Sequence, residues 1–228
     1  MSGWDSSKKI LMEELLFENK KVLDVGCGNG WFSIWADRNG CSVDAIDPSN
    51  AQIKDGKDKD QTNKINFMVA GAENINDLNN CYDLIFFFNS LHHIPDTMME
   101  KSIEYSKNKM DINGSIIIIE PIAKGNFHNF VKYIDDETSV RNKAYKTIKN
   151  CNKYNLEIVK ELMYDEIKRF KSGEECINFL SKVDEGRKSY IDNNIELLLN
   201  KFKDLSTYNN YKYEFTQPMR LNILKNIK

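Results

Sequence analysis

The stretch Lys20-Lys21-Val22-Leu23-Asp24-Val25-Gly26-Cys27-Gly28-Asn29-Gly30-Trp31-Phe32-Ser33 decides the fold of this chain. Its first half is a short apolar run typical of a buried strand, and its middle has glycine at every second position. Glycine adopts positive φ at little cost, and without a Cβ it lets a ligand lie against the backbone. A helical pattern starts after Gly30, and a helix start offers unpaired N–H groups. The stretch therefore predicts a strand, a ligand-binding loop and a helix.

The spacing of the glycines separates two kinds of ligand. A dinucleotide loop follows G-x-G-x-x-G, whereas this loop has the order Gly26-x-Gly28-x-Gly30. Asp24 stands two positions earlier, where its carboxylate would repel a pyrophosphate and attract an amine. The pattern Asp24-x-Gly26-x-Gly28-x-Gly30 resembles motif I of the class I S-adenosylmethionine-dependent methyltransferases. The resemblance implies that this loop, Cys27 included, holds the methionine moiety of the cofactor and that Asp24 supports it. A glycine-rich turn without a ligand is the alternative.

A second acid follows the next predicted strand. Residues 41–47 are expected to form a strand that ends in Asp47, 21 residues beyond Gly26, and Pro48-Ser49 then begins a helix. A carboxylate at this strand end of a βαβ unit can accept hydrogen bonds from both hydroxyls of a ribose, at a separation of about 20 residues. NAD enzymes and methyltransferases share this feature. It therefore places Asp47 and Pro48 at a nucleoside ligand without choosing between the two classes, and a strand-end cap is the alternative.

Two further strand ends supply candidates for the same site. Residues 65–69 are expected to form a third strand, and the resemblance implies that the loop after it lies against the adenine, with Ala72 and Glu73 beside the ring. Tyr82 to Phe88 is a continuous apolar run typical of a central strand that is buried on both faces. Ligands of open α/β sheets bind at the carboxyl ends of the strands. Asn89 and Ser90 follow this strand, and the resemblance places them on the cofactor.

Three side chains at strand ends are candidates for acid–base catalysis. His92 or His93 could face a methyl acceptor as a base or as an orienting hydrogen-bond partner, because histidine titrates near neutral pH. A helix from Pro95-Asp96, a turn at Asn113-Gly114 and a strand over residues 115–119 are expected next, and Glu120 ends that strand at the rim of the site. The alternatives are structural histidines and a solvated strand-end acid.

The second half of the chain resembles the family less. Residues 156–163 are expected to form a sixth strand, residues 172–204 a helical region interrupted at Gly186, and the region around Pro218 a closing strand or pair of strands. Strands that alternate with helices predict a parallel sheet. The resemblance implies an α/β, Rossmann-like, doubly wound fold with a seven-stranded, mostly parallel sheet and an antiparallel last strand. We expect one domain over residues 1–228, with a helical lid or insertion around 165–205.

Composition narrows the partners and the compartment. The 228 residues carry a formal net charge of −2 with acids and lysines mixed along the chain, which is not the footprint of a nucleic-acid-binding protein. The longest apolar runs have the length of strands, and residues 1–5 lack the features of a signal peptide. Five scattered cysteines without a C-x-x-C pair predict reduced thiols and no metal site. We expect a cytoplasmic monomer or homodimer without nucleic-acid or membrane partners.

Taken with the resemblance, these features predict an enzyme that transfers a methyl group from S-adenosylmethionine to a small-molecule acceptor by in-line displacement, with an oxygen or nitrogen nucleophile favoured. Enzymes that methylate amino groups of nucleic acids carry Asn or Asp followed by Pro-Pro and an aromatic residue where this chain has Asn89-Ser90-Leu91-His92. Two alternatives stay open. One is a non-catalytic S-adenosylmethionine-binding protein, and the other is an NAD-dependent oxidoreductase, which the glycine spacing disfavours.

Overall fold

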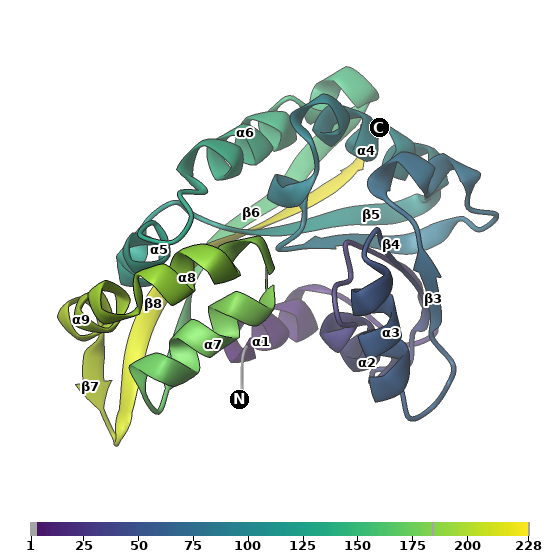
Figure 1. Cartoon of the computed structure of the whole chain (residues 1–228). Helices are drawn as coiled ribbons and strands as arrows, with labels where there is room; N and C mark the ends of the chain where they lie inside the picture. Colours follow the sequence, from purple (N-terminus) through teal and green to yellow (C-terminus); the bar gives the residue numbers. More distant parts are fainter. Residues whose placement is uncertain (1–3, 184, 228) are drawn as a thin grey trace. The chain divides into compact units, whose positions relative to one another are not determined.

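The computed structural model describes residues 4–183 and 185–227, in which strands and helices alternate over the first half of the chain (Figure 1). The strands are β1 (Lys21–Val25), β2 (Ser42–Asp47), β3 (Asn66–Val69), β4 (Tyr82–Phe88), β5 (Met110–Pro121), β6 (Leu156–Phe170), β7 (Thr207–Asn209) and β8 (Lys212–Asn226). The α-helices are α1 (Asp5–Glu14), α2 (Trp31–Arg38), α3 (Asn50–Lys59), α4 (Asp96–Lys109), α5 (Gly125–Val131), α6 (Thr138–Lys149), α7 (Gly173–Val183), α8 (Lys188–Asn193) and α9 (Ile195–Leu205). Short 3₁₀ helices are η1 (Ala72–Asp77), η2 (Leu91–His93), η3 (Cys151–Tyr154) and η4 (Glu185–Arg187).

The strands form one sheet in the order β3-β2-β1-β4-β5-β8-β6, and β7 pairs antiparallel with β8. The pairs β1–β2, β1–β4, β2–β3 and β4–β5 are all parallel. The predicted doubly wound, mostly parallel α/β fold is therefore confirmed, and β7 adds a short hairpin strand to the seven expected. The strand order reverses between β1 and β4, and ligands of such sheets bind outside the carboxyl ends of the strands at this point.

The described residues divide by their contacts into two compact units. The sheet unit comprises the described parts of 11–120, 140–163 and 220–228, and the helical unit those of 1–10, 121–139 and 164–219. The predicted lid region around 165–205 lies in the helical unit. The single domain with a lid stays a prediction.

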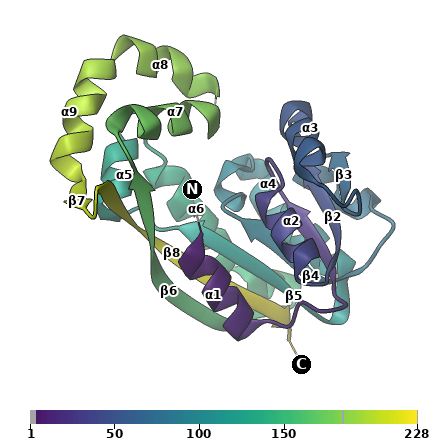
Figure 2. The ribbon, with the colours of Figure 1, turned by 90° about the horizontal axis from the view of Figure 1, so that it is seen from below.

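Strand β4 shows why the sheet unit needs an apolar run. Phe86 and Phe88 contact the ring of Phe32 on α2, at centroid distances of 4.5 and 5.5 Å. The alternate residues Ile85 and Phe87 belong to the core that includes buried side chains of α4 and α6. Figure 1 shows α2 and α3 on one face of these strands and α4 and α6 on the other, and Figure 2 gives the same unit from below. Both faces of β4 are thus buried, which a continuous apolar sequence permits.

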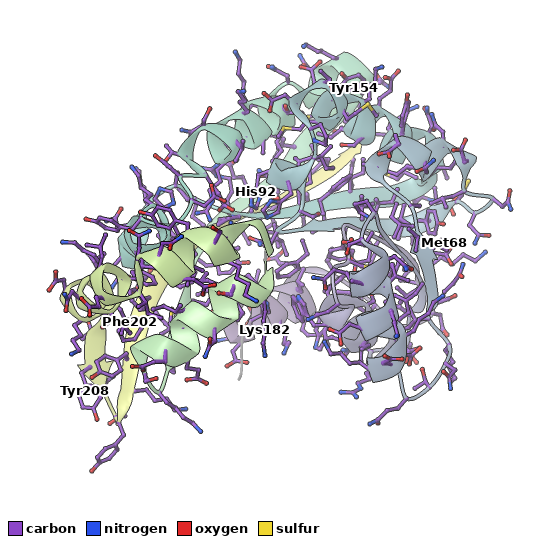
Figure 3. All side chains as sticks on the ribbon, viewed as in Figure 1. Met68, His92, Tyr154, Lys182, Phe202 and Tyr208 are labelled. Carbon is purple, nitrogen blue, oxygen red and sulfur yellow. The ribbon has the colours of Figure 1, made fainter. Side chains whose placement is uncertain are left out.

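The helical unit has a core of its own, built mainly from aromatic side chains. Phe130 on α5, Phe202 on α9 and Phe215 on β8 form a ring cluster with centroid distances of 5.3 to 6.0 Å (Figure 3 labels Phe202). Cys176, Ile177 and Leu180 of α7 are buried in the same core. Rings of this size bury a large apolar area, so a few of them can hold short helices together.

The start of β5 differs from the prediction. Helix α4 ends at Lys109, and Met110 is already extended (φ −80°, ψ 131°), so Asn113-Gly114 lies inside the strand. The predicted turn there is wrong. Between the pairs Tyr82–Met110 and Leu84–Ser115, β5 advances by more residues than β4, and this irregularity accommodates Gly114. A Cβ on Gly114 would lie 3.0 Å from the carbonyl oxygen of Asp83, so the strands approach too closely there for a side chain.

Strand β6 is also longer than predicted, because it continues past Met163 to Phe170.

Within residues 4–183 and 185–227, the helices are all too short or too polar to cross a membrane.

Candidate active site

The glycine loop between β1 and α2 has three glycines with positive φ: +70° at Gly26, +53° at Gly28 and +74° at Gly30. At two of them a side chain would also collide with a neighbour. A Cβ on Gly26 would lie 2.6 Å from Cβ of Ser90, and one on Gly30 would lie 2.6 Å from Cζ of Phe67. Around Gly28 the nearest atom of the described chain is Oε1 of Gln52, 4.0 Å from such a Cβ. The loop is therefore packed at both ends and open in its middle.

Neighbouring strand ends hold this loop in place. The N–H groups of Gly26 and Cys27 donate to the carbonyl oxygen of Ile46 on β2, at 2.8 and 3.0 Å. The hydroxyl of Ser90 donates to the carbonyl oxygen of Val25 at 2.6 Å. Cys27 is buried, and burial together with the nearby acids raises the pKa of its thiol, which stays neutral. The loop thus joins the ends of β1, β2 and β4.

Asp24 is buried at the end of β1 with 1 % of its surface exposed. Its Oδ2 accepts a hydrogen bond from the hydroxyl of Ser33 at 2.5 Å, whereas its Oδ1 makes none with the described residues. Burial raises the pKa of Asp24 to about 7, the Ser33 hydrogen bond opposes this rise, and the charge of Asp47 adds to it. A buried carboxylate oxygen without a partner is costly. The site is therefore suited to a hydrogen-bond donor or a cation at Oδ1.

Asp47 connects the end of β2 to the glycine loop. Its Oδ2 accepts the N–H of Gly28 at 2.9 Å, and its Oδ1 accepts the N–H of Ser49 at 2.8 Å. Each oxygen of an ionised carboxylate has two acceptor positions, so both oxygens can accept a further hydrogen bond. The structure thus brings Asp47 together with the loop, as the spacing predicts, while Pro48 is exposed beside it.

The loop after β3 lies next to this strand end. The N–H of Ala70 donates to the carbonyl oxygen of Asp47 at 3.1 Å, and η1 begins at Ala72. Ala72 is buried in the core of the sheet unit, so its side chain is packed inward. Glu73 is exposed, and its carboxylate lies over Gly71, where a Cβ would stand 2.3 Å from Oε2.

The chain turns sharply at the end of β4. Asn89 has a positive φ of +56°, and its N–H donates to the carbonyl oxygen of Ile119 on β5 at 2.7 Å. Asparagine tolerates this left-handed conformation better than most residues. The turn carries Ser90 to the glycine loop and starts η2, which holds both histidines.

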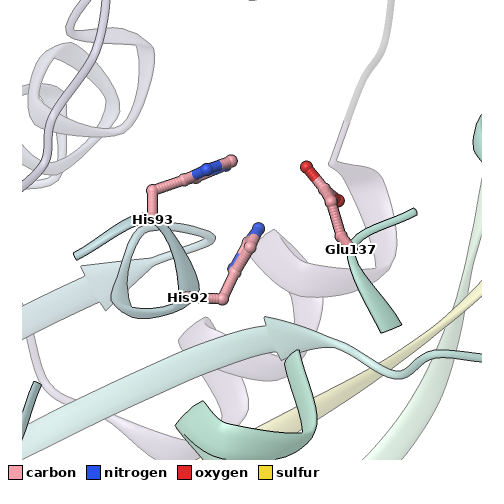
Figure 4. Close-up of side chains that lie close together, drawn as sticks. All are labelled: His92, His93 and Glu137. Atoms are coloured by element: carbon pink, nitrogen blue, oxygen red, sulfur yellow. The ribbon is translucent and has the colours of Figure 1, made fainter. Parts of the chain in front are cut away.

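The histidines and Glu120 form a compact group at the ends of β4 and β5. Glu120 is 6 % exposed, so the alternative of a solvated acid is wrong. Its Oε1 accepts the N–H of Leu91 at 2.9 Å, and its Oε2 is paired with Nδ1 of His92. His92 is buried and His93 is exposed, with ring centroids 4.0 Å apart (Figure 4). The geometry therefore makes Glu120 a partner of His92.

Two residues of the site were missed from the sequence. Ser33 is a third of the way along α2 and supplies the only hydrogen bond to the carboxyl group of Asp24 within the described chain. Ser49 caps α3 by accepting the N–H of Gln52 and also donates its own N–H to Asp47. Ser49 has the signal of a helix cap, whereas Ser33 is recognisable only once the helix is placed against the end of β1.

The fold and these strand ends define an α/β protein with a glycine loop and two strand-end acids at the reversal of its sheet. Residues 22–110 match a family model described as methyltransferase domain. In the structural comparison, a candidate methyltransferase of Bacillus halodurans has a TM-score of 0.65 at 16 % identity, over 96 % of this chain and 98 % of that one. At this identity the likeness concerns the fold.

Two curated relatives match parts of the chain. The tRNA U34 carboxymethyltransferase of Nautilia profundicola is 29 % identical over 62 % of this chain and 44 % of its own length. The ubiquinone biosynthesis O-methyltransferase of Coxiella burnetii is 30 % identical over 39 % of this chain and 38 % of its own length. The matches thus span less than half the length of these relatives. Residues 22–110 therefore match a methyltransferase domain, and the chain is similar to methyltransferases in its fold.

Proposed function

We propose that this chain binds S-adenosylmethionine at the glycine loop and transfers its methyl group to a small-molecule acceptor, with an oxygen or nitrogen nucleophile favoured. One observation carries the proposal: Oδ1 of Asp24, near the end of β1 and two residues before the glycine loop, is buried and makes no hydrogen bond with the described residues. An ammonium group is the natural partner of such an oxygen, and the open loop provides backbone for the rest of an amino acid. The methyltransferase-domain model that matches residues 22–110 supports the same ligand.

Each predicted residue has a role in this proposal. Asp24 would hold the amino group of the cofactor, and Gly26, Cys27, Gly28 and Gly30 would shape the loop around the methionine moiety. Asp47 would accept the ribose hydroxyls on the acceptor positions that its two backbone hydrogen bonds leave, beside Pro48. The adenine would lie by Ala72 and Glu73, and Asn89 and Ser90 would line the cofactor from the end of β4. No metal is part of the proposal.

When bound, the cofactor supplies an activated methyl group and its leaving group. The protein then needs to align the acceptor in line with the methyl group in a dry site, and to remove a proton only if the acceptor carries one. His92 fits the role of base, because Glu120 accepts at Nδ1 and so fixes the orientation of the ring. His93 is the exposed candidate for the same role, and Glu120 acts through His92.

A small-molecule acceptor is proposed over a nucleic acid. The formal net charge is −2, and Asn89-Ser90-Leu91-His92 departs from the pattern of enzymes that methylate nucleic-acid amino groups. One curated relative is an O-methyltransferase of ubiquinone biosynthesis and another acts on tRNA, so both acceptor classes must be tested. A cytoplasmic monomer or homodimer, with the segment around 165–205 as a lid, completes the proposal.

Methyl-labelled S-adenosylmethionine tests this function directly. The protein is incubated with a small-molecule extract in one arm and with bulk tRNA in the other, and label is followed by chromatography and by acid precipitation. We expect label in the small-molecule fraction, and its loss in His92→Asn at unchanged affinity for S-adenosylhomocysteine. Label in tRNA would overturn the acceptor class. Cofactor binding without transfer in either arm would favour the non-catalytic binder.

A further inference from the structure

We propose that Asp24 is a proton-linked gate of the cofactor site: it holds a proton until the α-ammonium group of the cofactor binds, and it then releases that proton to solvent. The inference rests on the proposed function, because it needs S-adenosylmethionine or S-adenosylhomocysteine as the ligand. It goes further in assigning a pH dependence to binding and a single residue to it.

The solvation of Asp24 is the first argument. The carboxyl group is 1 % exposed and receives one hydrogen bond, from Ser33, on Oδ2. Its Oδ1 makes no hydrogen bond within residues 4–183 and 185–227. An ionised carboxylate in a protein interior is stable when several donors or a cation surround it. With one donor and one uncompensated oxygen, the neutral acid is the better-accommodated form.

The charges around Asp24 point the same way. Asp47, across the loop on β2, is the charge that raises the pKa of Asp24, and Ser33 on α2 is the group that lowers it. The thiol of Cys27 in the loop is held neutral by burial and by these two acids. The strand neighbours in register with Asp24 are Ala45 on β2 and Phe86 on β4, both apolar. The groups that act on Asp24 therefore include an acid but supply no countercharge.

The consequence for binding follows from linkage. Burial raises the pKa of Asp24, the Ser33 hydrogen bond opposes this rise, and the charge of Asp47 adds to it. The resulting pKa is about 7, so near neutral pH about half of the molecules carry the proton on Asp24. A cation within hydrogen-bond reach lowers a carboxyl pKa by roughly 1–3 units. An ammonium group at Oδ1 would therefore convert COOH to COO⁻ and discharge one proton to the solvent.

The size of the effect can be estimated from this pKa. With a pKa near 7 in the free protein and full ionisation in the complex, the apparent dissociation constant is about tenfold higher at pH 6 than at pH 8. Proton release is about 0.9 per ligand at pH 6 and about 0.1 at pH 8.

Calorimetric titration with S-adenosylhomocysteine measures both quantities. Titrations at pH 6, 7 and 8 in pairs of buffers with low and high ionisation enthalpy give the affinity and the number of protons released. Asp24→Asn is expected to bind more weakly and to lose most of the proton release. Ser33→Ala removes the hydrogen bond that lowers the pKa of Asp24, so its binding is expected to weaken more at pH 6 than at pH 8, and the midpoint of its pH dependence to move to higher pH. Asp37→Asn is the matched control. Asp37 lies on α2, as Ser33 does, but its carboxylate accepts a hydrogen bond from Thr62, so this variant should behave as wild type.

The outcomes separate this inference from the proposed function. Binding that is independent of pH and of buffer overturns the gate and leaves the proposed cofactor intact. Proton release that persists in Asp24→Asn assigns it to another group and also overturns the gate. Failure of the wild type to bind at any pH overturns the proposed function itself. If Asp24→Asn does not fold by circular dichroism, the upward shift of the midpoint in Ser33→Ala decides, and no shift refutes the role of Asp24.

Discussion

Replacing Gly30 by alanine should destabilise the protein far more than a surface substitution. Gly30 has a φ of +74°, and a Cβ there would lie 2.6 Å from Cζ and 2.7 Å from Cε1 of Phe67. Phe67 is buried and has no room to retreat, because its ring also lies against Gly56, where a Cβ would be 2.8 Å from Cε1. A left-handed backbone costs an L-residue roughly 1–2 kcal/mol, and overpacking a core costs about 1–3 kcal/mol. We therefore expect the free energy of unfolding to fall by roughly 2–5 kcal/mol.

Gly28→Ala is the matched control, since it makes the same chemical change two residues away in the same loop. Gly28 also has a positive φ, of +53°, but a Cβ there would meet its nearest described neighbour at 4.0 Å. Only the backbone term of roughly 1–2 kcal/mol applies. The added methyl group would instead occupy the open side of the loop. We expect Gly28→Ala to remain folded with a much lower affinity for S-adenosylhomocysteine.

Urea denaturation followed by circular dichroism gives the free energies of unfolding of both variants, and calorimetry gives their affinities. The reasoning predicts that Gly30→Ala loses more stability and that Gly28→Ala loses binding at a smaller cost in stability. It would be refuted by a Gly30→Ala variant within 1 kcal/mol of wild type. Equal stability losses in the two variants would contradict it as well, because the collision with Phe67 would then have no effect.

Three further predictions concern buried charges. Burial lowers the pKa of Lys168 to about 8, and the charge of Glu166 opposes this shift. Between about pH 8 and 10.5 the unfolded state therefore binds more protons than the folded state. The free energy of unfolding should rise with pH across that range, by up to about 3 kcal/mol. Urea titrations at pH 7.5 and 10 measure this rise, which should shrink in Lys168→Met, and an unchanged rise in that variant would disprove the assignment. The side chain of Arg187 is buried and donates a hydrogen bond to Glu137 at 2.5 Å. Glu137→Gln removes one carboxylate from this buried cation, so the free energy of unfolding, measured by urea denaturation, should fall by about 3 kcal/mol. A fall of less than about 1 kcal/mol would contradict this. If Glu120 positions His92, Glu120→Gln should lower kcat at an unchanged dissociation constant for S-adenosylhomocysteine, and wild-type kcat would remove Glu120 from the mechanism.

The parts of the sheet that depend on neighbouring residues along the chain could be predicted from the sequence. The apolar run Tyr82 to Phe88 coincides with β4, and the glycine triplet marks the turn between β1 and α2, because each depends on neighbours along the chain. The turn at Asn113-Gly114 failed for the opposite reason. Asn-Gly is a strong local turn signal, but pairing of β5 with β4 extends the backbone there, and the irregular register accommodates the glycine.

The sequence predicted which residues lie at the candidate site better than it predicted their burial and their hydrogen bonds. Asp47 was placed by spacing alone, and it does bind the glycine loop. The environment of Asp24 was not visible, since its burial and its single bond to Ser33 depend on how α2 packs on the end of β1. Glu120 was expected at the rim of the site, with a solvated acid as the alternative, but its burial and its contacts with Leu91 and His92 were not visible in the sequence. Long-range contacts of this kind leave no periodic signal in the sequence.

The second half of strand β6, beyond Met163, and the buried charges of the helical unit had no sequence signal either. Lys168 lies in β6 beyond the predicted strand end, with its Nζ 3.3 Å from the ring centroid of Trp4. A lysine in a strand sequence that is rich in charged residues is normally exposed to solvent. Its burial depends on contact with the first residues of the chain, more than 160 positions away.

Calorimetric titration of the wild-type protein with S-adenosylhomocysteine and, in parallel, with NAD tests the central claim most directly. Asp47→Ala is the decisive variant, because it removes the carboxylate at the end of β2 that accepts the N–H groups of Gly28 and Ser49, and a thermal melt shows whether the variant stays folded. The account predicts that S-adenosylhomocysteine binds, that NAD does not, and that folded Asp47→Ala binds neither. Binding of NAD, or of neither ligand by the wild type, would contradict it.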